Sequence, residues 1–135
     1  MKKIWVALVF GTAFLVNSCQ ENKNNNGVIA KDLSAKEVQA LLAERKDIQL
    51  LDVRTPEEYA SGHLPNARLV DISRMATFKE TLEKMDKNKA AVVYCAVGGR
   101  SSRAKNILTE MGFKEVYNLS GGIMAWQNNG LPIER

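Results

Sequence analysis

The stretch A-A-V-V-Y-C-A-V-G-G-R-S, residues 90–101, joins an apolar run to a cysteine, two glycines and an arginine. The apolar run 90–94 is typical of a buried strand, and helical spacing of apolar residues follows Arg100. Adjacent glycines permit a tight loop between a strand and a helix. The N–H groups at a helix start favour negative charge, and the thiolate is the reactive form of cysteine. The stretch therefore predicts a strand, a loop and a helix that stabilise Cys95 as an exposed thiolate.

Strands and helices are expected to alternate along the chain on both sides of this loop. Capping boxes predict helix starts at Ser34 with Glu37 and at Thr55 with Glu58. The other expected helices are 77–85, 100–111 and a short one opened by Gly121-Gly122, and the expected strands are 28–30, 48–53, 69–72, 90–94 and 116–119. Alternation of this kind predicts a single α/β domain, with a central, mostly parallel sheet flanked by helices on both faces.

The first residues have the pattern of an export signal. Lys2 and Lys3 precede the apolar run 4–16, which is too short to span a bilayer comfortably. The run ends in V-N-S-C at Cys19 and resembles the lipobox of bacterial lipoproteins. The resemblance implies a signal peptide over 1–18, cleavage before Cys19 and a diacylglycerol on its sulfur. A plain signal peptide or an uncleaved anchor are the alternatives.

This organisation predicts where the protein is located. Residues 19–27, the lipidated cysteine and an Asn-rich polar tether, would hold a folded domain over 28–135 close to the membrane. We therefore expect an exported protein anchored to a bacterial membrane through the lipid on Cys19, on its periplasmic or cell-surface side.

Charge and composition exclude several function classes. The chain of 135 residues has 19 basic and 15 acidic residues, a net charge of +4, which falls to +2 when Lys2 and Lys3 are removed. This small charge, evenly spread, argues against nucleic acid as a partner. His63 is the only histidine, so the chain cannot build a multi-histidine metal site. We expect no metal and no cofactor, and a structural role for His63 in its turn.

Four stretches together resemble the rhodanese family of sulfurtransferases. They are L-D-V-R with E-E-Y (51–59), G-H-L-P-N-A (62–67), the loop 95–101, and Y-N-L with G-G-I and A-W (117–126). The resemblance covers the chain from about Ser34 to its end and is closest to single-domain, exported members. It implies a rhodanese-like fold and a persulfide relay, in which a donor such as thiosulfate, a polysulfide or a persulfide gives sulfur to the cysteine and cyanide or a thiol takes it away.

The resemblance also implies a role for each loop residue. Cys95 would be the nucleophile and sulfur carrier, and the substrate-binding loop would consist of Ala96, Val97, Gly98, Gly99, Arg100 and Ser101. Arg100 would orient the loop or an anionic donor, while Asp52 and Arg54 would form or brace an ion pair near the loop mouth. Many relatives that use thiosulfate have a basic residue where this chain has Ala96, which leaves the preferred donor open.

Other interpretations of the loop remain. Cys95 could be a buried structural cysteine, or could form a disulfide with Cys19. Against the disulfide, Cys19 lies in the predicted processing site and Cys95 in the predicted reactive loop. Cysteine phosphatases and arsenate reductases hold an oxyanion in a Cys-to-Arg loop with five intervening residues, whereas Cys95 and Arg100 enclose four. A sulfur carrier or binding module without turnover is a further alternative. Because an exposed thiolate outside the cytosol is prone to oxidation, a thiol-reducing protein partner or steady loading with sulfur could keep Cys95 usable.

Overall fold

The computed structural model describes residues 27–135. The predicted signal peptide 1–18, the predicted lipidation site Cys19 and the tether up to residue 26 lie outside the described residues and stay predictions. Within residues 27–135, no helix combines the length and apolar character needed to cross a membrane.

Strands and helices alternate throughout the described part of the chain. In order they are β1 (Ile29–Leu33), α1 (Ala35–Glu44), β2 (Gln49–Asp52), α2 (Pro56–Ser61), β3 (Arg68–Leu69), α3 (Met75–Glu83), β4 (Ala91–Tyr94), α4 (Gly99–Glu110), β5 (Glu115–Leu119) and α5 (Gly122–Asn128). All strand pairs are parallel, and the strands lie in the order β1-β5-β4-β2-β3. The predicted α/β fold with a central parallel sheet is confirmed.

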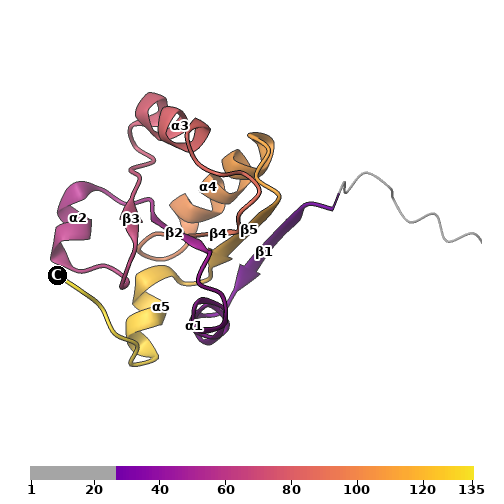
Figure 1. Ribbon diagram of the computed structural model, residues 1–135. Helices are drawn as coiled ribbons and strands as arrows, with labels where there is room; N and C mark the ends of the chain where they lie inside the picture. Colours follow the sequence, from indigo (N-terminus) through magenta and orange to yellow (C-terminus); the bar gives the residue numbers. More distant parts are fainter. Residues whose placement is uncertain (1–26) are drawn as a thin grey trace, which may run out of the picture.

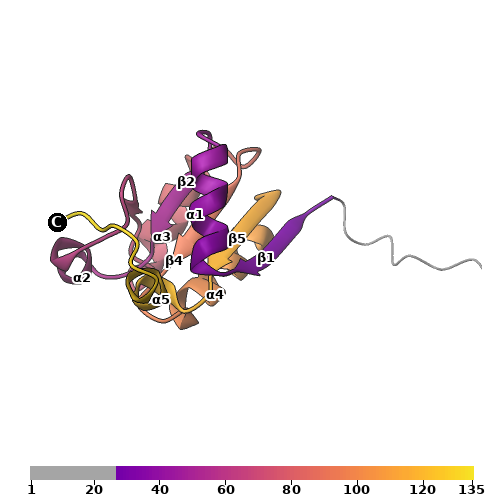
Figure 2. The same ribbon diagram turned by 90° about the horizontal axis from the view of Figure 1, so that it is seen from below.

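Helices cover both faces of this sheet (Figure 1), and their packing gives the domain two apolar cores. On one face, Phe78 and Leu82 of α3 and Ala104 and Leu108 of α4 pack against the sheet. On the other, α1 and α5 lie beside each other, as Figure 2 shows from below. Strand β4 lies at the centre of the sheet and all four of its residues are buried, which explains its uninterrupted apolar sequence.

Capping residues place two of the helix starts where the sequence predicts them. The Ser34 side chain accepts from the N–H of Glu37, and Thr55 and Glu58 form the reciprocal capping box at the start of α2. Helix α3 begins at Met75, two residues before the expected start at 77, and its N-cap residue Arg74 makes no side-chain cap. Without a capping residue the sequence carries no signal for that boundary.

Two strands differ from their expected ranges for physical reasons. Strand β1 continues to Leu33 instead of ending at residue 30, because an edge strand with exposed side chains does not need an apolar pattern. Strand β3 is only Arg68–Leu69, not 69–72, because its partner β2 ends at Asp52. The chain beyond β3 stays close to the segment that follows β2, because the N–H of Ile72 donates to the carbonyl of Val53 (3.1 Å).

Candidate active site at the Cys95 loop

The loop between β4 and α4 begins with Cys95, directly at the carboxyl end of the central strand. Gly98 is the N-cap residue of α4 and has φ of 111°, in the left-handed region that glycine adopts at little cost. The backbone can therefore turn back toward Cys95 before the helix begins at Gly99. Val97, at the tip of the turn, is 67% exposed.

Hydrogen bonds from the loop converge on the Cys95 sulfur. The N–H of Gly98 donates to Sγ (3.1 Å), and so does the Ser101 hydroxyl (3.3 Å), which also lies 3.2 Å from the Gly98 carbonyl oxygen. Burial by itself raises the pKa of the Cys95 thiol, but the Ser101 hydroxyl and the N–H groups of Ser101, Gly98 and Val97 outweigh that effect. The net result is a pKa of Cys95 below its ordinary value, so the loop favours the thiolate.

The start of α5 supports this loop from behind. The N–H of Ile123 donates to the Cys95 carbonyl (2.9 Å), and the N–H of Met124 donates to the Ala96 carbonyl (3.2 Å). This approach requires glycine at Gly122, where a Cβ would come closer than 3.0 Å to both carbonyl oxygens. The second glycine pair of the sequence thus fixes the position of the first loop residues.

The sequence-based expectation of an exposed thiolate is wrong. Cys95, which forms no disulfide within residues 27–135, is 1% exposed, because the loop folds over its sulfur while α5 covers its carbonyl. A reaction partner must therefore bring a small atom into the loop, or the loop must move. The thiol-reducing protein partner suggested by the sequence stays a prediction.

Asp52 and Arg54 form the predicted ion pair, and the structure adds partners to it. Arg54 Nη2 lies 2.7 Å from Asp52 Oδ2 and 2.7 Å from the Gly62 carbonyl oxygen. The Tyr94 hydroxyl donates to Asp52 Oδ2 (2.7 Å) and accepts from the N–H of Leu64 (3.1 Å). Burial lowers the pKa of Arg54, but the Asp52 carboxylate more than offsets this and raises it.

This buried network connects β2 and the 62–64 turn with Tyr94, the residue that precedes Cys95. The sequence did not indicate Tyr94, because its place in an apolar strand suggested packing alone. Asp52 and Arg54 are buried and bind one another and these partners. They therefore stabilise the end of the strand next to Cys95 and do not form the mouth of the loop.

Arg100 binds a residue that sequence reasoning assigned only to helix capping. Its guanidinium forms a two-point ion pair with Glu58, Nη1–Oε1 2.7 Å and Nη2–Oε2 2.8 Å. Arg100 lowers the pKa of Glu58 to about 2, and Glu58 raises the pKa of Arg100. No spacing rule could have found this pair, since 42 positions separate the two residues.

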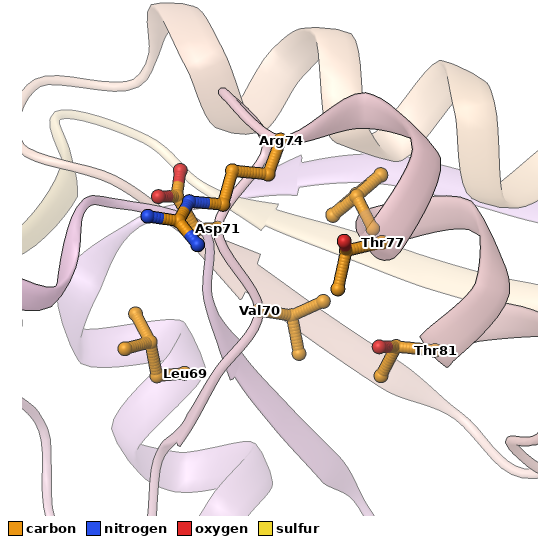
Figure 3. A pocket seen from close by; sticks show the side chains of 7 residues that line it. Leu69, Val70, Asp71, Arg74, Thr77 and Thr81 are labelled. Carbon is orange, nitrogen blue, oxygen red and sulfur yellow. The ribbon is translucent and has the colours of Figure 1, made fainter.

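A separate hollow of about 170 Å³ lies between the end of β3 and α3 (Figure 3). Asp71 and Arg74 point toward one another on one side of it, and Val70 faces Thr77 and Thr81 on the other. It is lined by Leu69, Val70, Asp71, Arg74, Thr77, Phe78 and Thr81. None of these belongs to the Cys95 loop. In residues 27–135, no cluster of three or more His, Cys, Asp or Glu side chains could hold a metal ion.

Comparison with known proteins agrees with this geometry. Residues 34–129 match the rhodanese-like domain family. The chain is 34% identical over 105 residues to a sulfurtransferase of Allochromatium vinosum, covering 78% of this chain and 95% of that protein. It is 41% identical over 86 residues to the thiosulfate sulfurtransferase GlpE of Coxiella burnetii, covering 64% and 78% of the two chains. The crystal structure of a rhodanese-like domain protein from Staphylococcus aureus superposes with a TM-score of 0.65 at 36% identity, covering 78% and 99% of the chains. The chain therefore belongs to the rhodanese family.

Proposed function

We propose that this protein is a sulfurtransferase that carries sulfane sulfur on Cys95. In the first step the Cys95 thiolate attacks the outer sulfur of a donor such as thiosulfate, a polysulfide or a persulfide. A new S–S bond forms at Cys95, the S–S bond of the donor breaks, and the leaving group keeps its electron pair. In the second step cyanide or a thiolate attacks the terminal sulfur, which breaks the new S–S bond and restores the Cys95 thiolate.

One observation carries this proposal: the Cys95 sulfur accepts hydrogen bonds from the Gly98 N–H and the Ser101 hydroxyl, at 3.1 and 3.3 Å. Donors in this arrangement stabilise an anionic sulfur, both as attacking group and as leaving group. The names of the relatives from Allochromatium vinosum and Coxiella burnetii support the same reaction class.

The phosphatase alternative has less support. A guanidinium that holds an oxyanion has to be free to bind it, whereas the Arg100 guanidinium, although close enough to interact with the Cys95 sulfur, is bound at two points by Glu58. The loop also encloses four residues between Cys95 and Arg100, one fewer than the oxyanion-binding loops of cysteine phosphatases. Both features suit a single sulfur atom better than a tetrahedral oxyanion.

The test is the intact mass of the protein after treatment with a sulfane donor. We would purify the full chain in mild detergent, because residues 4–16 are apolar, and incubate it with thiosulfate or polysulfide. The mass should increase by one sulfur atom, cyanide should remove that sulfur as thiocyanate, and the Cys95→Ser variant should do neither. A wild-type mass that no donor changes would refute the sulfurtransferase function.

Two further outcomes distinguish the alternatives. A persulfide that forms but that neither cyanide nor thiols discharge would indicate a carrier without turnover. Hydrolysis of a phosphate ester that is lost in Cys95→Ser would favour the phosphatase.

We also propose that a lipid on Cys19 holds the protein at a bacterial membrane, on its periplasmic or cell-surface side. The V-N-S-C sequence and the apolar run before it support this anchor. The Cys19→Ala variant should then no longer sediment with membranes, and a variant that stays bound would argue against lipidation as the sole anchor.

A further inference from the structure

The Glu58–Arg100 ion pair determines the charge at the mouth of the Cys95 loop. Two parallel hydrogen bonds of 2.7 and 2.8 Å hold the guanidinium, and the side chains of Arg100 and Glu58 are 40% and 33% exposed. With the pKa of Glu58 lowered to about 2, its carboxylate is charged at every physiological pH. The positive charge of Arg100 is therefore offset by an equal negative charge on its direct neighbour.

The other side chains of the loop do not replace this charge. Ala96 and Val97, which follow Cys95, are uncharged, and Val97 is 67% exposed at the tip of the loop. The charge of Arg54 is neutralised by Asp52 in the buried network. The direct attractions for an anion are then the backbone N–H groups and the Ser101 hydroxyl, beside an Arg100 guanidinium whose charge Glu58 offsets.

We infer that Glu58 is a specificity-determining residue, which acts through Arg100 and makes the site discriminate against strongly anionic sulfur donors. This inference rests on the proposed sulfurtransferase function. The substrate class that fits is a sulfane donor with one negative charge or none, in preference to a dianion such as thiosulfate. Glu58 is a positioning residue in this role, since its carboxylate contacts the guanidinium and not the reacting sulfur.

Two donors with the same reacting atom but different charge test this inference. Thiosulfate carries two negative charges, and the Cys95 thiolate takes its outer sulfur with release of sulfite. Methanethiosulfonate carries one, and the same attack releases methanesulfinate. In both reactions one S–S bond forms, one breaks, and the departing sulfur(IV) or sulfinate group keeps the electron pair.

The informative variant is Glu58→Gln in the full chain. Glutamine at this position preserves the capping-box hydrogen bond to Thr55 while removing the charge, so the start of α2 keeps its cap. The matched control is Glu57→Gln, which removes an equal charge from an exposed side chain in the same helix turn that is not bound to Arg100. Unfolding by denaturant would check that both variants are folded.

The expected result follows from the donor charges. Glu58→Gln leaves the positive charge of Arg100 at the loop mouth without its neutralising carboxylate. The value of kcat/KM for persulfide formation should then rise roughly threefold with methanethiosulfonate and roughly tenfold with thiosulfate, because the Coulomb energy is twice as large for a donor with two charges as for a donor with one. The ratio of the two values should therefore rise about threefold in Glu58→Gln, and the rise should diminish at about 0.5 M salt. Any change in the Cys95 pKa affects both donors equally and cancels in this ratio.

The possible outcomes separate the two proposals. If wild-type protein takes sulfur from none of thiosulfate, methanethiosulfonate and polysulfide, the sulfurtransferase function fails and the inference falls with it. If wild-type protein is sulfurated but the donor ratio of Glu58→Gln equals that of wild type, the inference alone is overturned. An equal change of the ratio in Glu57→Gln would also overturn it, because the effect would then come from the general surface charge and not from the ion pair.

Discussion

Replacing Gly122 with alanine should separate α5 from the Cys95 loop and destabilise the domain. A Cβ at this position would come closer than 3.0 Å to the carbonyl oxygens of Cys95 and Ala96, and both are backbone atoms that cannot rotate away. The variant must therefore move the start of α5. This movement lengthens the hydrogen bonds from the Ile123 and Met124 N–H groups, now 2.9 and 3.2 Å.

The loss of stability expected for Gly122→Ala follows from these contacts, and Gly130→Ala is the matched control. Gly122 and Gly130 have φ of 59° and 70°, so alanine at either position adopts a left-handed conformation that costs about 1 kcal/mol. A Cβ at Gly130 meets no atom within 4 Å, so that variant should lose only this amount. Gly122→Ala should lose about 1 kcal/mol more for each of the two hydrogen bonds, about 3 kcal/mol in total, and more if buried Trp126 is displaced.

Urea denaturation of the two variants beside wild type measures the difference between their losses of stability. The rate of Cys95 alkylation by iodoacetamide reports whether the conformation of the loop has changed. We expect Gly122→Ala to change the alkylation rate, because α5 no longer covers the carbonyl of Cys95, and Gly130→Ala to leave it unaltered. Equal destabilisation of the two variants would mean that the left-handed backbone, and not the close approach to the loop, requires glycine at Gly122.

Two further predictions concern the groups that surround Cys95. Ser101→Ala removes the hydroxyl that lies 3.3 Å from Sγ, so the pKa of Cys95 should rise and the pH profile of alkylation should move to higher pH. At neutral pH the alkylation rate should fall roughly fivefold, equivalent to about 1 kcal/mol, with no such change in the control Ser102→Ala; an unmoved profile would contradict the assigned hydrogen bond. Asp52→Asn leaves the buried Arg54 guanidinium without its carboxylate, so the free energy of unfolding in urea should fall by about 3 kcal/mol. A loss below about 1 kcal/mol would show that uncharged acceptors, the Gly62 carbonyl among them, satisfy Arg54.

The local features of the sequence predicted those parts of the fold that short-range physics controls. Ser34 and Thr55 are helix caps because their hydroxyls reach N–H groups three residues ahead, an interaction contained within one turn. The uninterrupted apolar run before Cys95 indicated a buried strand, and two glycines indicated the tight loop that follows it. Where no local signal exists, as at the uncapped start of α3 or along the polar edge strand β1, the predicted boundaries were wrong.

The alternation of strands and helices, the family and the cysteine on which the proposed chemistry rests could all be predicted from the sequence. The strand order, the burial of Cys95 and the pairing of Arg100 with Glu58 became visible only in the folded domain. These features depend on contacts between residues distant in sequence, such as Glu58 and Arg100 across 42 positions. Their energies arise from the packing of separate elements against one another, and no periodicity or spacing along the chain encodes them.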